Sequence, residues 1–544
     1  MKKFFLLIFS VAIIVPFLQA QEINPLDLQF QRLSVRRFVF SSGEGCRIPL
    51  CEFNPKEIVN FVSMHPTFKV NPEKNEPLYD ETFKPVLDNP TIGNGKLYLN
   101  GQSTFHVGAV NPFAIYDLEI ESNNGEVGID FAQYGLRNRV QILAVKDKGI
   151  VLRLVKDTEI VKEQILADKI PDSSFSAEVG SIGHIGYKLR VQLSGRLLAV
   201  FVEKDGVTTY IAHLDDKDHF GNILDFRNIE TNRVCSFNIY SQSLNGSSNV
   251  IRGACSYLSA GMGQADIRAV TDENLNPLID DDGRLWFMFS CRGIGLPHPS
   301  QGVLSVNPSV FDVRFEGIIV FDFGDGLLRN SVGTHLFYDR KAKEWRAYSC
   351  DFGGSKNKEG RSESNLFFAV SPKDPRHGYS VMKAELITND KLSGHHEDPC
   401  IFYDETAEKW RLLTSVFTPK VGIAACVFES ETWNGKWTQI TPPIDQNATG
   451  TTIQRFGDKL YCLMGGRGNL RVHSYPDLKY LGDLKLDLQP NYPKLTGRVW
   501  ANVIPLPEGY PYRYVLLTMD RANFTGIKSP TWSYGALYFY GANP

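Results

Sequence analysis

The chain has 544 residues, of which 42% are hydrophobic and 22% charged, and its formal net charge is −3. A length of this order favours two domains over one, and the composition is that of an ordinary globular protein. The weakly negative charge argues against a general attraction to nucleic acid, so no nucleic-acid partner is expected.

The first 20 residues have the pattern of a cleavable bacterial signal peptide. Two lysines precede an apolar stretch from Phe4 to Phe17, and Ala20 offers a small residue at the cleavage point. The apolar stretch is short for a membrane span, so none is expected. The sequence therefore predicts a periplasmic or secreted protein, whose mature net charge would be −3 − 2 = −5 after loss of the two lysines.

Residues 21–65 are expected to form an irregular N-terminal strap. This segment contains Cys46 and Cys51, which are close enough in sequence to close a small disulfide loop in an oxidising compartment. The sequence leaves open whether they do. The other cysteines mostly lie in apolar, strand-like runs and are expected to be buried free thiols, and no CxxC pair occurs. Neither a metal site nor a cofactor is predicted.

Residues 66–250 alternate apolar and polar side chains in the manner of β-strands. The runs Tyr187–Leu193 and Leu197–Glu203 predict a hairpin, and a second turn follows at Lys204-Asp-Gly206. We expect this domain to be an antiparallel β-sandwich of the concanavalin or laminin-G type, which buttresses the rest of the chain.

Residues 251–544 contain a five-fold repeat in which a polar turn is followed by an aromatic residue that opens a strand. The aromatic positions are Trp286, Trp345, Trp410, Tyr461 and Tyr514. Their spacings of 59, 65, 51 and 53 residues are typical of a β-propeller. The predicted fold is therefore all-β: a β-sandwich followed by a five-bladed β-propeller.

Propeller geometry allows the pocket residues to be predicted from the sequence. The first two strands of a blade are antiparallel, so the start of the first lies beside the end of the second, at one face of the disc. The predicted pocket residues are Asp266, Arg268, Arg292, His335, Asp351, His396, Glu397, Asp398, Arg467, Arg498, Trp500, Asp520 and Arg521.

Carboxylates from different blades suit the hydrolysis of a glycosidic bond. One carboxyl group protonates the leaving oxygen, and the other attacks the anomeric carbon or activates water. Asp266 on the first blade and Glu397 or Asp398 on the third are the candidate catalytic residues. Neighbouring residues on a strand point to opposite faces, so one of Glu397 and Asp398 is expected to reach the substrate.

These residues resemble those of the five-bladed propeller glycoside hydrolases, the group that includes families 32, 43, 68, 117 and 130. Asp266 matches the aspartate that opens the first blade in that group, and Glu397-Asp398-Pro399 is similar to its later Asp-Pro motif. The resemblance implies a glycosidase. The Trp-Asn-Asp-Pro opening of the fructosidases is absent, and the acidic pair is adjacent here, whereas the group takes its carboxylates from separate blades.

The arginines in the predicted pocket indicate the kind of sugar. A guanidinium binds a carboxylate or sulfate through a planar two-point fork, so the substrate is expected to be an anionic sugar: uronic, keto-acid or sulfated. Trp500 could supply a stacking surface. The layout resembles polysaccharide-degrading enzymes of Bacteroidota, including a type that releases a keto-diacid sugar from pectin. An oligo- or polysaccharide partner and exo-acting release are therefore expected, while the oligomeric state stays open.

Four other functions stay open, of which a propeller that serves only as a protein-interaction platform is the least favoured by the convergent carboxylates. A polysaccharide lyase would use a histidine such as His335, His395 or His396 as base, with Arg268 or Arg498 neutralising a uronate. A sialidase-like enzyme would suit the arginines, but the Ser-x-Asp-x-Gly-x-Thr-Trp repeats are absent. A non-catalytic carbohydrate-binding protein would use the same residues for affinity alone.

Overall fold

The fold was analysed in a computed structural model of the chain. It describes residues 23–37, 40, 47–49, 70–71, 76–77, 91–171, 186–195, 197–214, 221–292, 300–356, 362–387, 389, 392, 395–465, 470–487, 498–520 and 536–544. At Arg292, Arg498 and Asp520, among others, only the backbone is described. The predicted signal peptide, the Cys46/Cys51 pair, Arg467 and Arg521 lie outside the described residues.

The C-terminal half consists of antiparallel meanders that follow one another along the chain. The first contains β18 (Gly263–Ala269), β20 (Leu285–Arg292), β21 (Ser300–Asn307) and β22 (Asp312–Asp322), and the second contains β24 (Val332–Asp339), β25 (Glu344–Lys356), β26 (Ser362–Ser371) and β27 (Gly378–Leu386). The third contains β28 (His396–Asp404), β29 (Lys409–Thr418), β30 (Gly422–Ser430) and β31 (Thr438–Thr441), and the fourth contains β32 (Thr449–Phe456), β33 (Lys459–Gly465), β34 (Arg471–Ser474) and β35 (Tyr480–Asp483). The fifth contains β37 (Arg498–Pro505), β38 (Tyr514–Asp520) and β39 (Ala536–Ala542).

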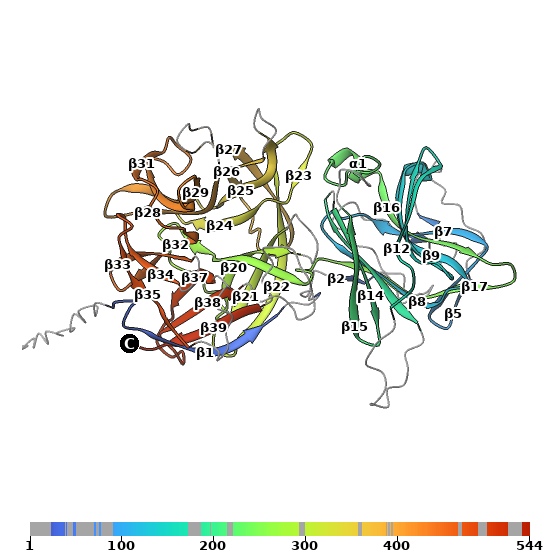
Figure 1. The fold of residues 1–544 in the computed structure, drawn as a ribbon, viewed down its shortest axis with the longest axis horizontal. Helices are drawn as coiled ribbons and strands as arrows, with labels where there is room; N and C mark the ends of the chain where they lie inside the picture. Colours follow the sequence, from blue (N-terminus) through green and yellow to red (C-terminus); the bar gives the residue numbers. More distant parts are fainter. Residues whose placement is uncertain are drawn as a thin grey trace, which may run out of the picture.

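The first strands of these meanders form a closed ring. β18 contacts β24, β24 contacts β28, β28 contacts β32, β32 contacts β37, and β37 returns to β18. Figure 1 shows β24, β28, β32 and β37 in the same lobe of the molecule. This is the arrangement of a five-bladed β-propeller, and each inner strand starts where the sequence repeats predict. The all-β prediction is confirmed, since the described residues contain only one α-helix, α1 (Ile229–Arg233), and one short 3-10 helix, η1 (Tyr134–Leu136).

Hydrogen bonds between inner strands join each blade to the next. Thr271 contacts His335 (3.1 Å), and His335 Nδ1 accepts from the Ile401 amide (3.1 Å). Thr451 Oγ1 donates to the Asp398 carbonyl (3.0 Å), and Thr452 Oγ1 donates to the Ala501 carbonyl (3.0 Å). Asn502 closes the ring, because its side chain bonds to the Ile267 carbonyl and the Ala269 amide. The ring therefore has polar links at all of its junctions as well as an apolar core.

The fifth blade takes its outer strand from the other end of the chain. β1 (Gln29–Arg36) pairs antiparallel with β39, and β36 (Lys485–Leu486) pairs parallel with β1. The segment predicted to be an irregular strap therefore contains a strand of the propeller. The prediction missed it because β1 has no neighbouring strand in sequence, and its pairing with β39 depends wholly on tertiary contacts.

The first two blades are joined along their outer edges. β22 pairs parallel with β27, which makes one ten-stranded sheet from both blades, with β19 (Thr271–Asp272) and β23 (Leu328–Arg329) as short additions. An exposed outer edge is an open template for strand pairing, and this contact covers two such edges at once.

The N-terminal half consists of two antiparallel sheets. One contains β12 (Glu159–Ala167), β11 (Gly149–Lys156), β10 (Arg139–Val145), β9 (Gly125–Gln133), β16 (Cys235–Ser243) and β7 (Gln102–Ala109), in that spatial order. The other contains β15 (Val207–Leu214), β14 (Leu197–Lys204), β13 (Tyr187–Ser194), β8 (Ile115–Ser122), β17 (Ser248–Tyr257), β6 (Lys96–Asn100) and β5 (Thr91–Gly93), with β2 (Arg47–Pro49) on β17. The predicted hairpins are present as β13–β14 and β14–β15. β3 (Val70–Asn71) and β4 (Glu76–Pro77) form a separate two-stranded ladder.

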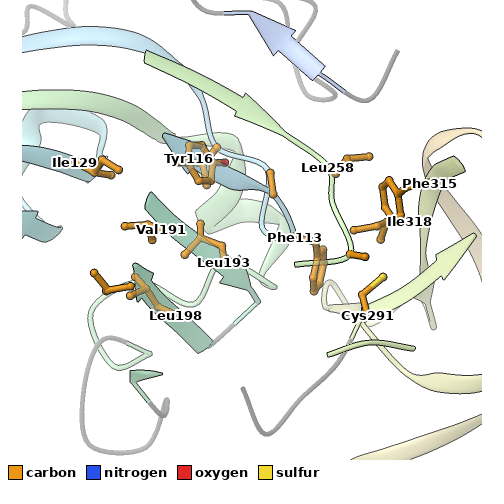
Figure 2. Packing of buried hydrophobic residues seen from close by; sticks show 14 of the residues in the cluster. Phe113, Tyr116, Ile129, Val191, Leu193, Leu198, Leu258, Cys291, Phe315 and Ile318 are labelled. Carbon is orange, nitrogen blue, oxygen red and sulfur yellow. The ribbon is translucent and has the colours of Figure 1, made fainter. Parts of the chain in front are cut away.

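The apolar faces of the two sheets pack against each other. The Tyr116 ring on β8 lies 4.9 Å from the Phe131 ring on β9 and 4.9 Å from the Phe237 ring on β16. We call this part of the chain the two-sheet unit. Its core is continuous with that of the first blade, as Figure 2 shows at Phe113, Leu258 and Ile318. One hydrophobic cluster therefore joins the two halves of the chain, while the propeller contains further clusters of its own.

No helix within the described ranges is long and apolar enough to span a membrane.

Candidate active site

All five inner strands begin with the same bulge. In each blade the pairing with the second strand shifts register near the start of the inner strand, and the bulged residue has a positive φ. The five equivalent residues are Asp266 (φ 53°), Gly333 (φ 76°), Asp398 (φ 59°), Gly450 (φ 62°) and Trp500 (φ 61°). A bulge re-aims the side chain at its extra residue, so this repeated feature creates equivalent positions around one end of the ring.

Three of these positions hold residues that do not favour the left-handed conformation. Glycine adopts it freely, whereas other residues pay about 1–2 kcal/mol, and such strain gathers at functional sites. Asp266 and Asp398 occupy it on the first and third blades. The two aspartates predicted to be catalytic are therefore structurally equivalent residues of two blades.

Asp398 lies in a tight, dry setting. Its side chain is 4% exposed, and Oδ2 accepts hydrogen bonds from the Gly450 amide (2.7 Å) and the Thr449 hydroxyl (2.9 Å). Burial and, to a smaller extent, the charge of Asp266 raise its pKa to about 6, although the two donors and Arg268 oppose the shift. A carboxyl group with this pKa can hold a proton near neutral pH and release it to a substrate.

Asp266 and Glu397 complete a cluster of carboxylates around one cysteine. The Ser290 hydroxyl donates to Asp266 Oδ2 (2.5 Å), and the Glu397 side chain is 7% exposed. The pKa of the Cys350 thiol rises well above its usual range, mainly through burial and also through the charges of Asp398, Glu397 and Asp266. All three carboxylates therefore lie close enough to the Cys350 thiol, on the second blade, to act on it electrostatically.

The Glu397–Asp398 pair departs from simple strand alternation. The bulge lies between Glu397 and Cys400 in the pairing with β29, so the two acidic side chains are not fixed on opposite faces as the sequence pattern suggested. The prediction that only one of them reaches the pocket rested on that alternation. The bulge removes this argument.

A second layer of side chains lies two residues beyond each bulge. It consists of Arg268, His335, Cys400, Thr452 and Asn502, one from each inner strand. All five line one cavity, which extends toward the far ends of these strands. The carboxylates therefore lie at one end of the channel, and this layer lines the channel beneath them.

Arg268 reaches across the channel from the first blade. Its Nη2 atom donates to the carbonyl oxygens of Asp398 (3.2 Å) and Thr451 (2.9 Å), and its guanidinium carbon lies 4.9 Å from the centre of the Trp500 ring. The side chain is 2% exposed, and burial lowers its pKa. The structure thus places Arg268 in contact with backbone and an indole, and its predicted substrate contact stays a prediction.

His335 is engaged through both ring nitrogens. Nδ1 accepts from the Ile401 amide, so Nε2 bears the proton and faces Thr271 Oγ1 at 3.1 Å. Burial lowers the His335 pKa well below its usual range, and the charge of Arg268 adds to this effect. The ring is neutral and ties three blades together. Among the described residues, no group of three or more metal-ligating side chains gathers.

The structure describes the side chains of three further predicted pocket residues. Asp351 is buried on β25 next to Cys350, and His396 is buried with its ring 5.9 Å from that of Phe428. Trp500 is 2% exposed and packs against Arg268, so its ring is covered on that side. Their substrate contacts stay predictions.

Strand register brings three further predicted residues to the carboxylate end. Arg292 pairs with Gly263 at the start of β18, and Arg498 pairs with Asp520 at the start of β37. Only the backbone is described at these three positions. Arg467 and Arg521 lie outside the described residues.

Several residues of the site were not predicted from the sequence. Ser290, Thr449 and Gly450 hold the two aspartates, and Cys350 lies among the three carboxylates. Their positions in the repeats could have identified them, because all four lie at the start of an inner strand or at the end of a second strand. Polar residue type alone did not distinguish the hydroxyls from ordinary strand residues.

Comparisons with known proteins give structural likenesses alone. No family model matches the chain, and no curated protein matches it. An α-L-arabinofuranosidase from Lactobacillus brevis is similar over 51% of this chain and 90% of its own, at 12% identity and a TM-score of 0.37. Zg3597, a family 117 glycoside hydrolase from Zobellia galactanivorans, is similar over 52% of this chain and 84% of its own, at 9% identity and a TM-score of 0.36.

A further likeness covers a smaller share of the chain. The carbohydrate-binding module CBM66 from Bacillus subtilis is similar over 32% of this chain and 95% of its own, at 11% identity and a TM-score of 0.23. All three TM-scores lie below 0.5. The function is therefore argued from the residues of the site.

Proposed function

We propose that the chain is an exo-acting glycoside hydrolase that removes an anionic sugar from a complex polysaccharide. One observation supports this most strongly: Asp266 and Asp398 occupy equivalent strained bulges on two blades, and the charge of one raises the pKa of the other. Pairs of carboxyl groups whose environments separate their protonation are the mark of acid–base catalysis at a glycosidic bond.

The environments favour different roles for the two aspartates. Asp398, with a pKa of about 6, is the proposed general acid, whose proton passes to the glycosidic oxygen as the bond to the leaving group breaks. Asp266, held by the Ser290 hydroxyl, is the proposed nucleophile or base. Glu397 is the third proposed catalytic carboxylate of the site.

The anionic character of the substrate rests on the arginines at the same end of the ring. Arg292 and Arg498 lie in strands that end or begin there, in register with Gly263 and Asp520. A guanidinium at either position could form a two-point contact with a carboxylate or sulfate on the sugar. The substrate class proposed is therefore uronic, keto-acid or sulfated.

The proposal extends to the rest of the chain. The two-sheet unit is proposed to be a β-sandwich of the concanavalin or laminin-G type that buttresses the propeller, and its shared core with the first blade supports this role. The first 20 residues are proposed to direct export to the periplasm or medium, where a polysaccharide substrate would be met.

The lyase alternative loses one of its candidate bases. His335 has both ring nitrogens engaged by Thr271 and Ile401 and a pKa held well below its usual range. Such a ring has no free lone pair to take a proton from a uronate. Hydrolysis is therefore the better supported reaction.

The test is a screen of acidic and neutral oligosaccharides with the full chain and its Asp266→Asn, Glu397→Gln and Asp398→Asn variants. Released sugar is measured by chromatography, and absorbance near 235 nm reports any unsaturated lyase product, roughly where a conjugated carboxylate absorbs. Loss of either aspartate should lower kcat/KM about 10²–10⁴-fold, the usual contribution of a positioned acid or base.

The exposed Asp281 lies in a surface turn of the first blade, so Asp281→Asn is the matched control and should keep full activity. Full activity in both Asp266→Asn and Asp398→Asn would refute the proposed site. A rise in absorbance near 235 nm would establish a lyase instead.

A further inference from the structure

The channel beneath the carboxylates opens into a cavity that the proposed reaction does not use. It has a volume of about 60 Å³ and lies toward the far ends of the inner strands, at Gln454, Val503 and Pro505. A buried water needs roughly 10–15 Å³ of such space, so the cavity has room for a guest larger than one water molecule.

The charged residues that line the cavity are all basic. Arg268 and Arg455 both line it, and no aspartate or glutamate does. His335, which also lines it, is neutral because its Nδ1 atom accepts a backbone hydrogen bond. Neither arginine forms an ion pair with a described residue. The walls therefore present two positive groups and no carboxylate of their own, because Asp398, whose charge acts on Arg268, lies outside the lining.

Arg268 has hydrogen-bonding capacity to spare. Its Nη2 atom is engaged by two carbonyl oxygens, whereas Nε and Nη1 are buried and have no oxygen or nitrogen acceptor among the described residues. The guanidinium has only a weak additional interaction with the Cys400 sulfur. Leaving a charged group buried without partners costs several kcal/mol, so such atoms are normally matched by a counter-charge or a polar guest. The side chain is 2% exposed, which keeps bulk solvent from filling that role.

The remaining walls limit the size and kind of guest. Leu275, Pro277, Ile453 and Val503 give them an apolar character, and the Cys400 thiol adds a weak donor. A polyatomic dianion such as sulfate needs many donors to replace its water. A weakly hydrated halide needs few, and an arginine beside apolar carbon suits it.

We propose that this cavity is a binding site for a single halide-sized monovalent anion, chloride in the natural setting, held by Arg268 and entering past Arg455. The anion completes the hydrogen bonding of the guanidinium and stabilises the ring from its axis. This site lies apart from the sugar pocket, and it stands whether or not the chain is a glycosidase.

The direct test is crystallography of the full chain with bromide in place of chloride. An anomalous difference peak in the cavity, within hydrogen-bonding reach of Arg268 Nε or Nη1, is the expected result. Water alone in the cavity at high bromide concentration would overturn the proposal. Bromide found only on the outer surface would be an adventitious ion and would overturn it equally.

A second measurement follows stability in solution. A ligand that binds only the folded state raises Tm in step with the logarithm of its concentration, so chloride should raise Tm above its value in gluconate at equal ionic strength. Arg268→Gln should abolish that difference. Arg340→Gln, which alters an exposed arginine, should preserve it. An equal chloride effect in Arg268→Gln would refute the site, and the bromide experiment decides the matter if that variant does not fold.

Discussion

Asp398 shows what the proposed catalytic position costs in stability at the scale of one residue. Its carboxyl group is buried, it faces the charge of Asp266, and its backbone is in the left-handed region. Two donors, from Thr449 and Gly450, and the charge of Arg268 partly offset these effects. Folding would be more favourable with a neutral side chain here, which is the usual relation between a strained functional site and stability.

This cost depends on pH. The folded pKa of Asp398, about 6, lies above the ordinary value of 3.8, so its carboxyl group stabilises the fold when protonated, and that stability is lost as pH rises through 6. Asp398→Asn keeps an oxygen for the Gly450 amide and removes the charge. We expect it to be more stable than wild type at pH 7.5, with the difference shrinking as pH falls from about 6 toward 4.

Chemical denaturation across that pH range measures the effect. Asp281→Asn, at an exposed position in the same half of the chain, should match wild type throughout. A variant that is less stable than wild type at pH 7.5 would contradict the buried, charge-opposed setting of Asp398.

At the residue scale the sequence located the acidic residues but not their geometry. The repeats predicted that Asp266 and Asp398 begin inner strands, which is where they lie. They could not predict the positive φ of either aspartate, because an aspartate in an extended pattern normally keeps an extended backbone. Gly333 and Gly450 were the available signal, since glycine often marks a bulge within a strand.

At the element scale the bulge is the unit that builds the site. It recurs at the start of every inner strand and places the fourth-blade glycine beside the fifth-blade tryptophan. A Cβ atom on Gly450 would lie 2.7 Å from the Trp500 amide nitrogen, a distance that real Cβ atoms do not adopt. Gly450 also donates to Asp398, so its backbone fixes two neighbouring blades.

Gly450→Ala should therefore be strongly destabilising. The left-handed conformation alone costs an alanine about 1–2 kcal/mol, and the clash with β37 adds to that. Gly378→Ala is the matched control, because Gly378 has nearly the same φ (63° against 62°) and open space around its Cβ position. Denaturant midpoints should fall modestly for Gly378→Ala and much further for Gly450→Ala. Equal falls in the two denaturant midpoints would show that the close approach to Trp500 does not contribute to the destabilisation.

At the scale of the whole molecule the ring depends on a strand from the opposite end of the chain. Phe30 on β1 is 1% exposed and packs in the core between the fourth and fifth blades, with Leu470, Val503 and Leu516 among its neighbours in that cluster. The adjacent Gln31 points outward. The strand is thus held by apolar burial on one face as well as by its pairing with β39.

Replacing Phe30 with alanine should cost about 3–5 kcal/mol, the usual loss for a buried phenylalanine. Gln31→Ala, one residue away on the exposed face, should change stability by less than about 0.5 kcal/mol. Thermal or chemical unfolding compares the two. Similar stability in both variants would mean that β1 is dispensable to the ring.

The sequence predicted the large-scale plan better than its connections. Aromatic residues at a regular spacing, such as Trp286 and Trp345, located the blades because each blade buries its own strands locally. The parallel pairing of β22 with β27 and the insertion of β1 beside β39 left no such pattern, because each joins segments whose spacing follows no repeat.

The pairing of β1 with β39 also sets an order of events during synthesis. Gln31 lies opposite Gly541, a separation of 541 − 31 = 510 residues. At roughly 5–20 residues per second, the ribosome needs on the order of 25–100 seconds to make the second partner after the first has emerged. During that interval β1, with the apolar side chains of Phe30, Leu33 and Val35, lacks its partner strand. A chaperone that shields such segments would have its clearest target at the very beginning of this chain.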